Sequence, residues 1–171
     1  GEVQNNADSV ETSGGKNLTI DINCMYSRLE VKGKLFPTYT YYVANALQFS
    51  NVRQNQYPIS LENDIDLSKA YPEWTPIKEL KVAINGKGKL VKGMSITCPS
   101  SDVTNIGLIG TSYVGALLLR VEGKIDLRSY SGSSFINVGG IVGYNAKTAA
   151  TDDTDEVISH IFTCSFTGNI T

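Results

Sequence analysis

Short alternating segments that recur around glycines constrain the fold of this chain more than any other feature. Gly107-Leu-Ile-Gly110 is echoed by Gly140-Ile-Val-Gly143, and Leu119-Arg-Val-Glu-Gly-Lys-Ile125 is echoed by Cys164-Ser-Phe-Thr-Gly-Asn-Ile170. A weaker earlier copy is Met94-Ser-Ile96. Repeats of short strands and glycine turns are typical of β-solenoids, because each coil buries its apolar side only against the next coil. The pattern therefore predicts an all-β chain built from stacked coils.

Aligning the copies predicts two columns of stacked apolar side chains. The columns are Met94, Leu119, Cys164 and Ile96, Val121, Phe166, with steps of 25 and 45 residues. The longer step contains a polar insert, Lys147–Glu156. We place this insert in a turn, since only the turns of a solenoid can lengthen without breaking the stack.

The chain divides into three regions of different character. Residues 1–15 are polar and have no hydrophobic period, which predicts a flexible tail. Residues 16–37 contain two segments of alternating apolar and polar residues, which predict an N-terminal β hairpin or cap. Residues 38–171 are assigned to the solenoid, and within them Tyr39–Val52 is predicted as a strand followed by a helix.

Composition excludes several classes of function. The 171 residues carry Lys+Arg 15 against Asp+Glu 17, a net charge of −2, so we expect no nucleic-acid partner. No apolar run is long enough to predict a transmembrane segment. His160 is the only histidine and lies beside no obvious nucleophile, and the cysteines Cys24, Cys98 and Cys164 are far apart. We expect buried, inert thiols rather than a catalytic pair or a zinc site.

Six fragments resemble a known family in both sequence and order. Leu61–Leu67 (LENDIDL), Trp74–Ile77 (WTPI) and Ile84–Gly88 (INGKG) resemble the opening of bacterial GLUG-repeat surface proteins. Three later segments resemble the repeat itself: Gly107–Gly110, Val138–Asn145 and Cys164–Ile170. The resemblance covers roughly residues 40–171, and the chain departs from it in having only two clear glycine-rich repeats and unmatched N-terminal strands.

This resemblance implies a fold and a location. It implies a right-handed parallel β-helix of about three to four coils, on a protein that is secreted or held at the outer cell surface of a Bacteroidetes-type bacterium. The repeats of that family carry no established catalytic residues. Residues 38–171 would form the β-helix, and residues 16–37 would cap it.

A carboxylate trio is the first candidate site. Glu62, Asp64 and Asp66 alternate with apolar residues, which predicts three carboxylates about 6.6 Å apart on an outer strand face. Asp64 and Asp66 would suit an inverting glycosidase pair, and the trio would suit Ca²⁺. The alternative is a solvated face whose like charges discourage edge pairing, and we favour it.

Three other clusters each have a functional and a structural interpretation. Tyr57, Tyr71 and Trp74 would form a sugar-stacking platform or, for Trp74 above all, pack in the core. The acidic insert would bind Ca²⁺ or remain a solvated loop, and it lacks EF-hand spacing. Its acidic residues are Asp152, Asp153, Asp155 and Glu156. A basic stretch would bind an anionic glycan or protect turns and edges. It comprises Lys78, Lys81, Lys87, Lys89 and Lys92.

The sequence therefore favours a non-catalytic secreted or cell-surface module for adhesion or for binding a host or bacterial surface glycan or protein. Two alternatives stay open: a carbohydrate-active β-helix enzyme using the outer-face carboxylates, and a purely structural spacer. No cofactor is expected apart from the Ca²⁺ alternatives. An end-to-end homo-oligomer is a further expectation, because an open solenoid end exposes unpaired backbone groups.

Overall fold

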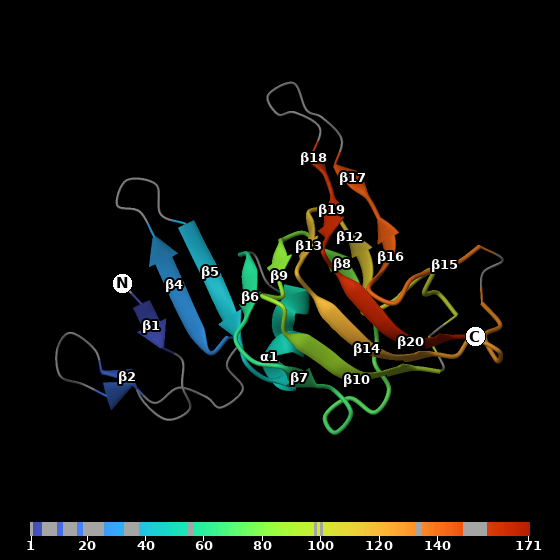
Figure 1. The fold of residues 1–171 in the computed structure, drawn as a ribbon, viewed down its shortest axis with the longest axis horizontal. Coiled ribbons are helices and arrows are strands. Elements are labelled where there is room, and N and C mark those ends of the chain that lie inside the picture. Colours follow the sequence, from blue (N-terminus) through green and yellow to red (C-terminus); the bar gives the residue numbers. More distant parts are fainter. Residues whose placement is uncertain are drawn as a thin grey trace.

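The structure is a computed structural model that describes residues 2–4, 10–11, 17–18, 26–32, 38–54, 57–97, 99, 101–132, 135–148 and 157–171. These residues are mostly β-strand, with one short α-helix and one 3-10 turn (Figure 1). The expectation of a mostly-β chain is confirmed. The strands of the main body pair in parallel, and the sheets do not close into a barrel.

Three sheets of stacked parallel strands form the main body, and successive strands along the chain enter different sheets (Figure 1). The first sheet contains β6 (Ile59–Leu61), β9 (Ile84–Asn85), β13 (Gly115–Leu117) and β19 (His160–Phe162). The second contains β7 (Ile65–Asp66), β10 (Leu90–Ile96), β14 (Arg120–Ile125) and β20 (Ser165–Ile170). The third contains β8 (Ile77–Leu80), β12 (Ile109–Ser112) and β16 (Val142–Asn145).

Two smaller strand pairs accompany these sheets. β11 (Asn105–Ile106) and β15 (Asn137–Val138) pair in parallel beside the third sheet. β17 (Lys147–Thr148) and β18 (Val157–Ile158) pair antiparallel and project from the body (Figure 1). β17 begins the predicted polar insert and β18 directly follows it, and residues 149–156 of the insert fall outside the described residues.

The N-terminal strands extend the first sheet. β4 (Arg28–Lys32) pairs antiparallel with both β1 (Glu2–Gln4) and β5 (Thr38–Val43), and β5 pairs in parallel with β6. β2 (Val10–Glu11) and β3 (Asn17–Leu18) pair with each other. A helix, α1 (Ala46–Asn51), and a 3-10 turn, η1 (Val52–Gln54), follow β5. The predicted strand followed by a helix in Tyr39–Val52 is confirmed.

Local sequence explains where α1 begins and what it covers. Asn45 precedes the helix, and its side-chain oxygen accepts a hydrogen bond of 2.9 Å from the Gln48 backbone N–H. The Gln48 side chain in turn accepts one of 2.9 Å from the Ala44 N–H, so two backbone donors at the helix start are satisfied. The buried Phe49 ring lies 5.8 Å from the Trp74 ring, centroid to centroid. The helix therefore closes one end of the core.

The register confirms the two best sequence echoes. Arg120 to Ile125 pair in order with Ser165 to Ile170, and Ile109 pairs with Val142. Matching residues of the echoed segments therefore lie side by side in neighbouring parallel strands. Val121 and Phe166 stack as predicted, and pairing through β10 adds Val91 and Ile65 to their column.

The alignment of the weaker copy is wrong. Met94 pairs with Gly123 and Ile96 with Ile125, rather than with Leu119 and Val121. The register of β10 against β14 shifts between Val91 and Met94, where Gly93 has a positive φ of 71°. A β-bulge of this kind changes the offset between the strands by one residue only, from 30 to 29. The predicted offset of 25 residues is therefore a separate error, because apolar spacing alone matched Met94–Ile96 to a part of the repeat four residues too early.

Candidate functional site

A groove of about 390 Å³ lies on the outer side of the third sheet. Parts of β8, β11 and β12 line it, together with Tyr144 of β16 and the segment that precedes β11. We call it the tyrosine groove. It is lined by Thr75, Pro76, Lys78, Glu79, Asp102, Val103, Thr104, Asn105, Thr111, Tyr113 and Tyr144.

Strand register builds the floor of the tyrosine groove. Glu79, Thr111 and Tyr144 occupy matching positions of β8, β12 and β16, so their side chains form one row across the sheet. The Asn105 amide nitrogen donates a hydrogen bond of 2.9 Å to the Thr111 hydroxyl. The Asn137 side-chain amide donates one of 2.8 Å to the side-chain oxygen Oδ1 of Asn105. The floor is therefore a fixed polar network rather than a set of free side chains.

An aromatic residue holds one wall of the tyrosine groove. The Tyr130 hydroxyl donates a hydrogen bond of 2.8 Å to the Val103 backbone oxygen, which anchors the segment before β11. Tyr144 also lines the groove, is 49% exposed, and lies on β16, the last strand of the third sheet among the described residues. Aromatic side chains, hydroxyls, an amide and carboxylates thus meet in one concave surface, the combination that binding sites for small polar ligands use.

The electrostatics of the tyrosine groove are mixed. Lys81 Nζ lies 3.2 Å from Glu79 Oε2, an exposed ion pair that contributes little to stability. Lys78 lines the same groove as Glu79 and Asp102. Because both signs are present, the groove suits an uncharged polar ligand better than a polyanion.

A neighbouring hollow of about 500 Å³ has a structural explanation. It is lined by Val52, Arg53 and residues 75–81. The Arg53 guanidinium donates hydrogen bonds of 2.8 Å to Pro76 O and 2.6 Å to Thr75 O, and it lies 4.7 Å from the Trp74 ring centroid. Burial lowers the pKa of Arg53. These contacts tie η1 to the chain before β8.

The carboxylates of the predicted trio have separate partners. A bend around Asn63 separates β6 from β7, so Glu62, Asp64 and Asp66 do not share one straight strand. Glu62 accepts hydrogen bonds from the Ser27 hydroxyl and, at 3.4 Å, from Arg28 Nε. Asp64 accepts one of 2.8 Å from the Leu90 backbone N–H. Each of these two carboxylates therefore connects a different pair of elements.

Asp66 is held by its own turn. Its side chain accepts hydrogen bonds from the Ser68 N–H at 3.0 Å and the Ser68 hydroxyl at 2.6 Å, and Lys92 Nζ lies 3.5 Å away. The Ser68 hydroxyl, followed by the Ser68 N–H, lowers the pKa of Asp66. Neither Asp64 nor Asp66 lines either hollow. The geometry fits the structural interpretation of these carboxylates.

The three aromatic candidates fall into two groups. Trp74 is 1% exposed, donates a hydrogen bond of 3.0 Å to Leu108 O, and contacts Tyr71 edge-on at 5.5 Å. Its ring therefore offers no free face to a sugar. Tyr57 instead packs against Tyr39 and Tyr41 at ring-centroid distances of 4.9 and 5.4 Å. The structure does not join these residues into one platform.

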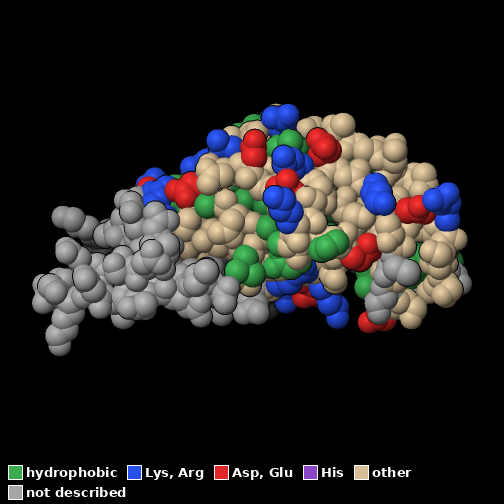
Figure 2. Space-filling view, turned by 90° about the horizontal axis from the view of Figure 1, so that it is seen from below, with side chains coloured by type: hydrophobic (Ala, Val, Ile, Leu, Met, Phe, Trp, Pro, Cys, Tyr) green, Lys and Arg blue, Asp and Glu red, His purple; other side chains and the backbone are tan. Residues whose placement is uncertain are grey.

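The lysines of the basic stretch do not form a patch of one sign. Lys81 and Lys92 pair with acidic residues, and Lys87 Nζ lies 4.5 Å from the Tyr42 ring centroid. Figure 2 shows Lys and Arg side chains beside Asp and Glu side chains over the face seen from below. This distribution fits the interpretation that these lysines protect turns and edges.

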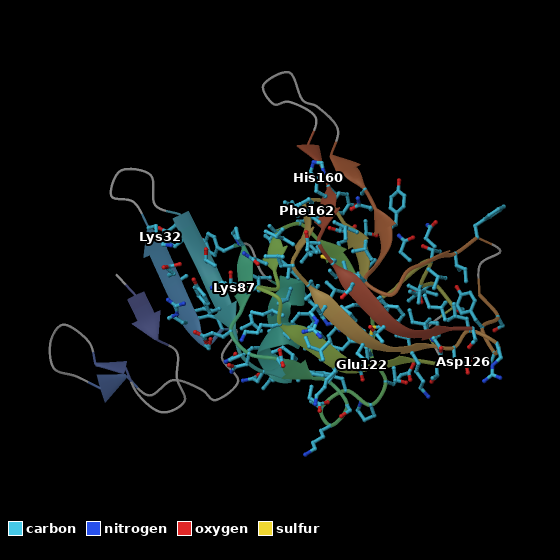
Figure 3. All side chains as sticks on the ribbon, in the orientation of Figure 1. Lys32, Lys87, Glu122, Asp126, His160 and Phe162 are labelled. Carbon is cyan, nitrogen blue, oxygen red and sulfur yellow. The ribbon has the colours of Figure 1, made fainter. Side chains whose placement is uncertain are left out.

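The remaining candidates are placed as follows. Cys164 is half-buried, and its Sγ donates to Ala116 O at 3.4 Å, whereas Cys24 and Cys98 lie outside the described residues. His160 is exposed on β19 (Figure 3). The acidic residues 152, 153, 155 and 156 also fall outside the described residues. Over the part of the chain that the structure describes, no three His, Cys, Asp or Glu residues gather as a metal site.

Sequence reasoning missed the tyrosine groove although a signal for it existed. Thr111 directly follows Gly107–Gly110, and Tyr144 directly follows the matching segment Gly140–Gly143. Aligning the two segments therefore already places Thr111 beside Tyr144. The path of the segment before β11 decides on which side of the sheet the remaining lining residues meet. These residues include Asp102, Asn105 and Tyr113. No local pattern in the sequence encodes that path.

Comparison with protein-family models, with curated proteins and with solved structures gives no match to this chain. None of the helices in the described ranges is long and apolar enough to cross a membrane.

Proposed function

We propose that this chain is a non-catalytic, secreted or cell-surface module that binds a short uncharged glycan in the tyrosine groove. The observation that carries the proposal is the convergence of Tyr113, Tyr144, Thr111 and Asn105 in one concave surface with fixed polar groups. Tyrosine rings pack against the apolar faces of sugars, and hydroxyl, amide and carboxylate groups bind sugar hydroxyls.

We propose further that the three sheets are the faces of a right-handed parallel β-helix, as the resemblance to GLUG-repeat surface proteins implies. Support comes from strands that return to the same sheets in the same order, and from matching residues that stack in register. A stack of this kind is rigid, so a groove on its side is held in shape before the ligand arrives.

A glycoside hydrolase is the second candidate function, and one observation favours it. Glu79 and Asp102 both line the tyrosine groove, and glycosidases use a pair of carboxyl groups that flank the scissile bond. The binding module ranks first because the Glu79 carboxylate already contacts Lys81. An exposed Lys–Glu contact of this kind is common on protein surfaces and does not point to catalysis.

A glycan array combined with a polysaccharide-depolymerisation screen tests both functions. We expect retention of a neutral oligosaccharide without release of products, and loss of at least about tenfold in affinity for Tyr144→Ala, because one stacked ring is removed. Tyr57→Ala is the matched control, since it removes a tyrosine from a different part of the surface. Its affinity should equal that of the parent chain.

Three results would decide against the proposal or change its class. Equal binding by Tyr144→Ala and the parent chain would place the ligand elsewhere. Release of products that is lost in Glu79→Gln would make the chain a hydrolase. No retention of any glycan would leave the structural spacer as the better description.

A further inference from the structure

Thr111 lies in the middle of the row that forms the floor of the tyrosine groove, and it carries an unused hydrogen-bond donor. The residue is 6% exposed and lines the groove. Its hydroxyl oxygen accepts a hydrogen bond of 2.9 Å from the Asn105 side-chain amide. No described residue accepts a hydrogen bond from the Thr111 hydroxyl in return. Because a buried donor without an acceptor is costly, this position requires an acceptor that enters the groove.

The hydrogen bonds that lead to Thr111 all run in one direction. The Asn137 side-chain amide donates to Asn105 Oδ1 at 2.8 Å, and the Asn105 amide donates to the Thr111 hydroxyl. Asn105 and Asn137 also occupy matching positions of β11 and β15, so strand pairing keeps the two amides together. Hydrogen bonds in such a chain polarise one another, which strengthens the last donor. That last donor is the Thr111 hydroxyl on the groove floor.

A hydrogen-bond acceptor lies beside this donor. Glu79 occupies the matching position on β8, and neighbouring strands are about 4.8 Å apart. Lys81 Nζ contacts Glu79 Oε2, whereas no described residue donates a hydrogen bond to Glu79 Oε1. The floor therefore offers one donor and one acceptor on adjacent strands, close enough for a single amide group to contact both.

Apolar surface lies next to this pair. The Tyr144 ring follows Thr111 in the same row, and Pro76 and Val103 also line the groove. An acetamido group matches all three features, because its carbonyl oxygen accepts a hydrogen bond, its N–H donates one and its methyl group is apolar. A sugar hydroxyl in this place fits less well, since it brings a donor of its own and no apolar group.

On the basis of the proposed function, we infer that the glycan in the tyrosine groove is an N-acetylated amino sugar, whose acetamido group lies between Thr111 and Glu79. The Thr111 hydroxyl donates to the acetamido carbonyl oxygen, and the Glu79 carboxylate accepts from the acetamido N–H. The sugar ring packs against Tyr144. An acetamido group is uncharged, which agrees with the mixed charges of the groove.

Isothermal titration calorimetry with chitotetraose and cellotetraose tests this inference. The two sugars share one linkage and differ in a single substituent of each ring, which is acetamido in chitotetraose and hydroxyl in cellotetraose. We expect the chain to bind chitotetraose about tenfold more tightly or better. Thr111→Val removes the hydroxyl at almost constant volume and should reduce this preference to about twofold or less. Thr111→Ser keeps a hydroxyl and should retain the preference.

Two controls separate recognition of the acetamido group from folding and from stacking. Thr167→Val makes the same exchange at an exposed position of β20 outside the groove, and it should leave both affinities unchanged. Tyr144→Ala removes the ring on which either sugar would pack, so it should weaken both. A preparation that is partly unfolded binds less of both sugars, and it cannot remove the preference for one of them.

Each contrary outcome has a distinct meaning. Equal affinity of the parent chain for the two sugars, with both weakened by Tyr144→Ala, would overturn this inference and leave the proposed function standing. Binding of neither sugar would overturn both. A Thr111→Val variant that keeps the full preference would show that another group reads the acetamido substituent. An acetyl-lysine peptide that binds as tightly as chitotetraose would assign the groove to a protein ligand instead of a sugar.

Discussion

At the scale of single residues, the polar side chains of this protein mainly satisfy backbone groups. Asp64 accepts a hydrogen bond from the Leu90 N–H, and Asp66 accepts one from the Ser68 N–H. The Trp74 side chain donates a hydrogen bond to Leu108 O. Short strands joined by many connections leave backbone donors and acceptors unpaired between the strands, and these side chains provide partners for them. A carboxylate on such a chain is therefore more often structural than catalytic, and its role has to be read from its partners.

Asp126 should make stability depend on pH in the acid range. Hydrogen bonds from the Arg128 side chain and N–H lower its pKa from 3.8 to about 2. Because the pKa of Asp126 is lower in the folded than in the unfolded state, its ionised carboxylate stabilises the fold at every pH above the unfolded pKa. This stabilisation is lost as the pH falls from about 4 to about 2. We expect Asp126→Asn to be less stable than the parent chain at neutral pH, with the difference vanishing near pH 2, as measured by urea unfolding.

Arg128→Gln is the reciprocal control, because it removes the guanidinium donors and keeps the carboxylate and the backbone N–H donor. It should raise the Asp126 pKa toward 3.8 and weaken the same pH dependence. A stability difference between Asp126→Asn and the parent chain that stays constant across this range would show that the ion pair is not its source.

Gly123 should not tolerate a side chain. A Cβ there would contact the Met94 backbone oxygen and lie 2.7 Å from the Met94 Cβ, so the neighbouring strand would have to move. We expect Gly123→Ala to lower the free energy of unfolding by about 2–3 kcal/mol. Gly88→Ala is the control: its φ of 74° is unfavourable, but nothing lies near the added methyl group, so the loss should be about 1 kcal/mol. The opposite order would contradict the close approach.

At the scale of elements, short strands depend on their neighbours more than on their own sequence. β7, β9 and β11 have two residues each; β9 is held by pairing with both β6 and β13, whereas β7 pairs with β10 and β11 with β15. α1 has six residues, which is too short to persist alone, so its cap and its packing on Trp74 must hold it. The helix in turn covers the core at that end.

The cap of α1 provides a test at this scale. We expect Asn45→Ala to destabilise the protein by about 1 kcal/mol, because the Gln48 N–H loses its acceptor. Asn45→Asp keeps an acceptor at the same position and should retain most of the stability. Chemical denaturation measures both variants, and equal losses would show that the hydrogen bond contributes nothing.

At the scale of the whole molecule, protection should follow position in the stack. β14 has a hydrogen-bonded strand on each side, whereas β20 pairs only with β14 among the described strands. Hydrogen exchange followed by mass spectrometry should therefore show slower exchange in β14 than in β20 at low protein concentration. Equal protection of the two strands under those conditions would contradict the stacked arrangement.

The sequence by itself determined the repeating parallel strands. The echoes of Gly107–Gly110 and Leu119–Ile125 pair in register with their copies, because an equal spacing of inward apolar residues favours side-by-side pairing of the repeated strands. It also determined the strand and helix after residue 38. It could not locate the bulge in β10, because one extra residue in one strand leaves the apolar spacing almost unchanged.

Only the tertiary structure decided which side chains share a surface. It separated Glu62, Asp64 and Asp66, although they lie close in sequence, because each turned to a different backbone or side-chain partner. It brought Asp102 and Tyr144 to one groove, although 42 residues of sequence separate them, because parallel stacking returns the chain to the same sheet. Local spacing records the alternation within a strand, whereas the groove is assembled from strands that are far apart in sequence.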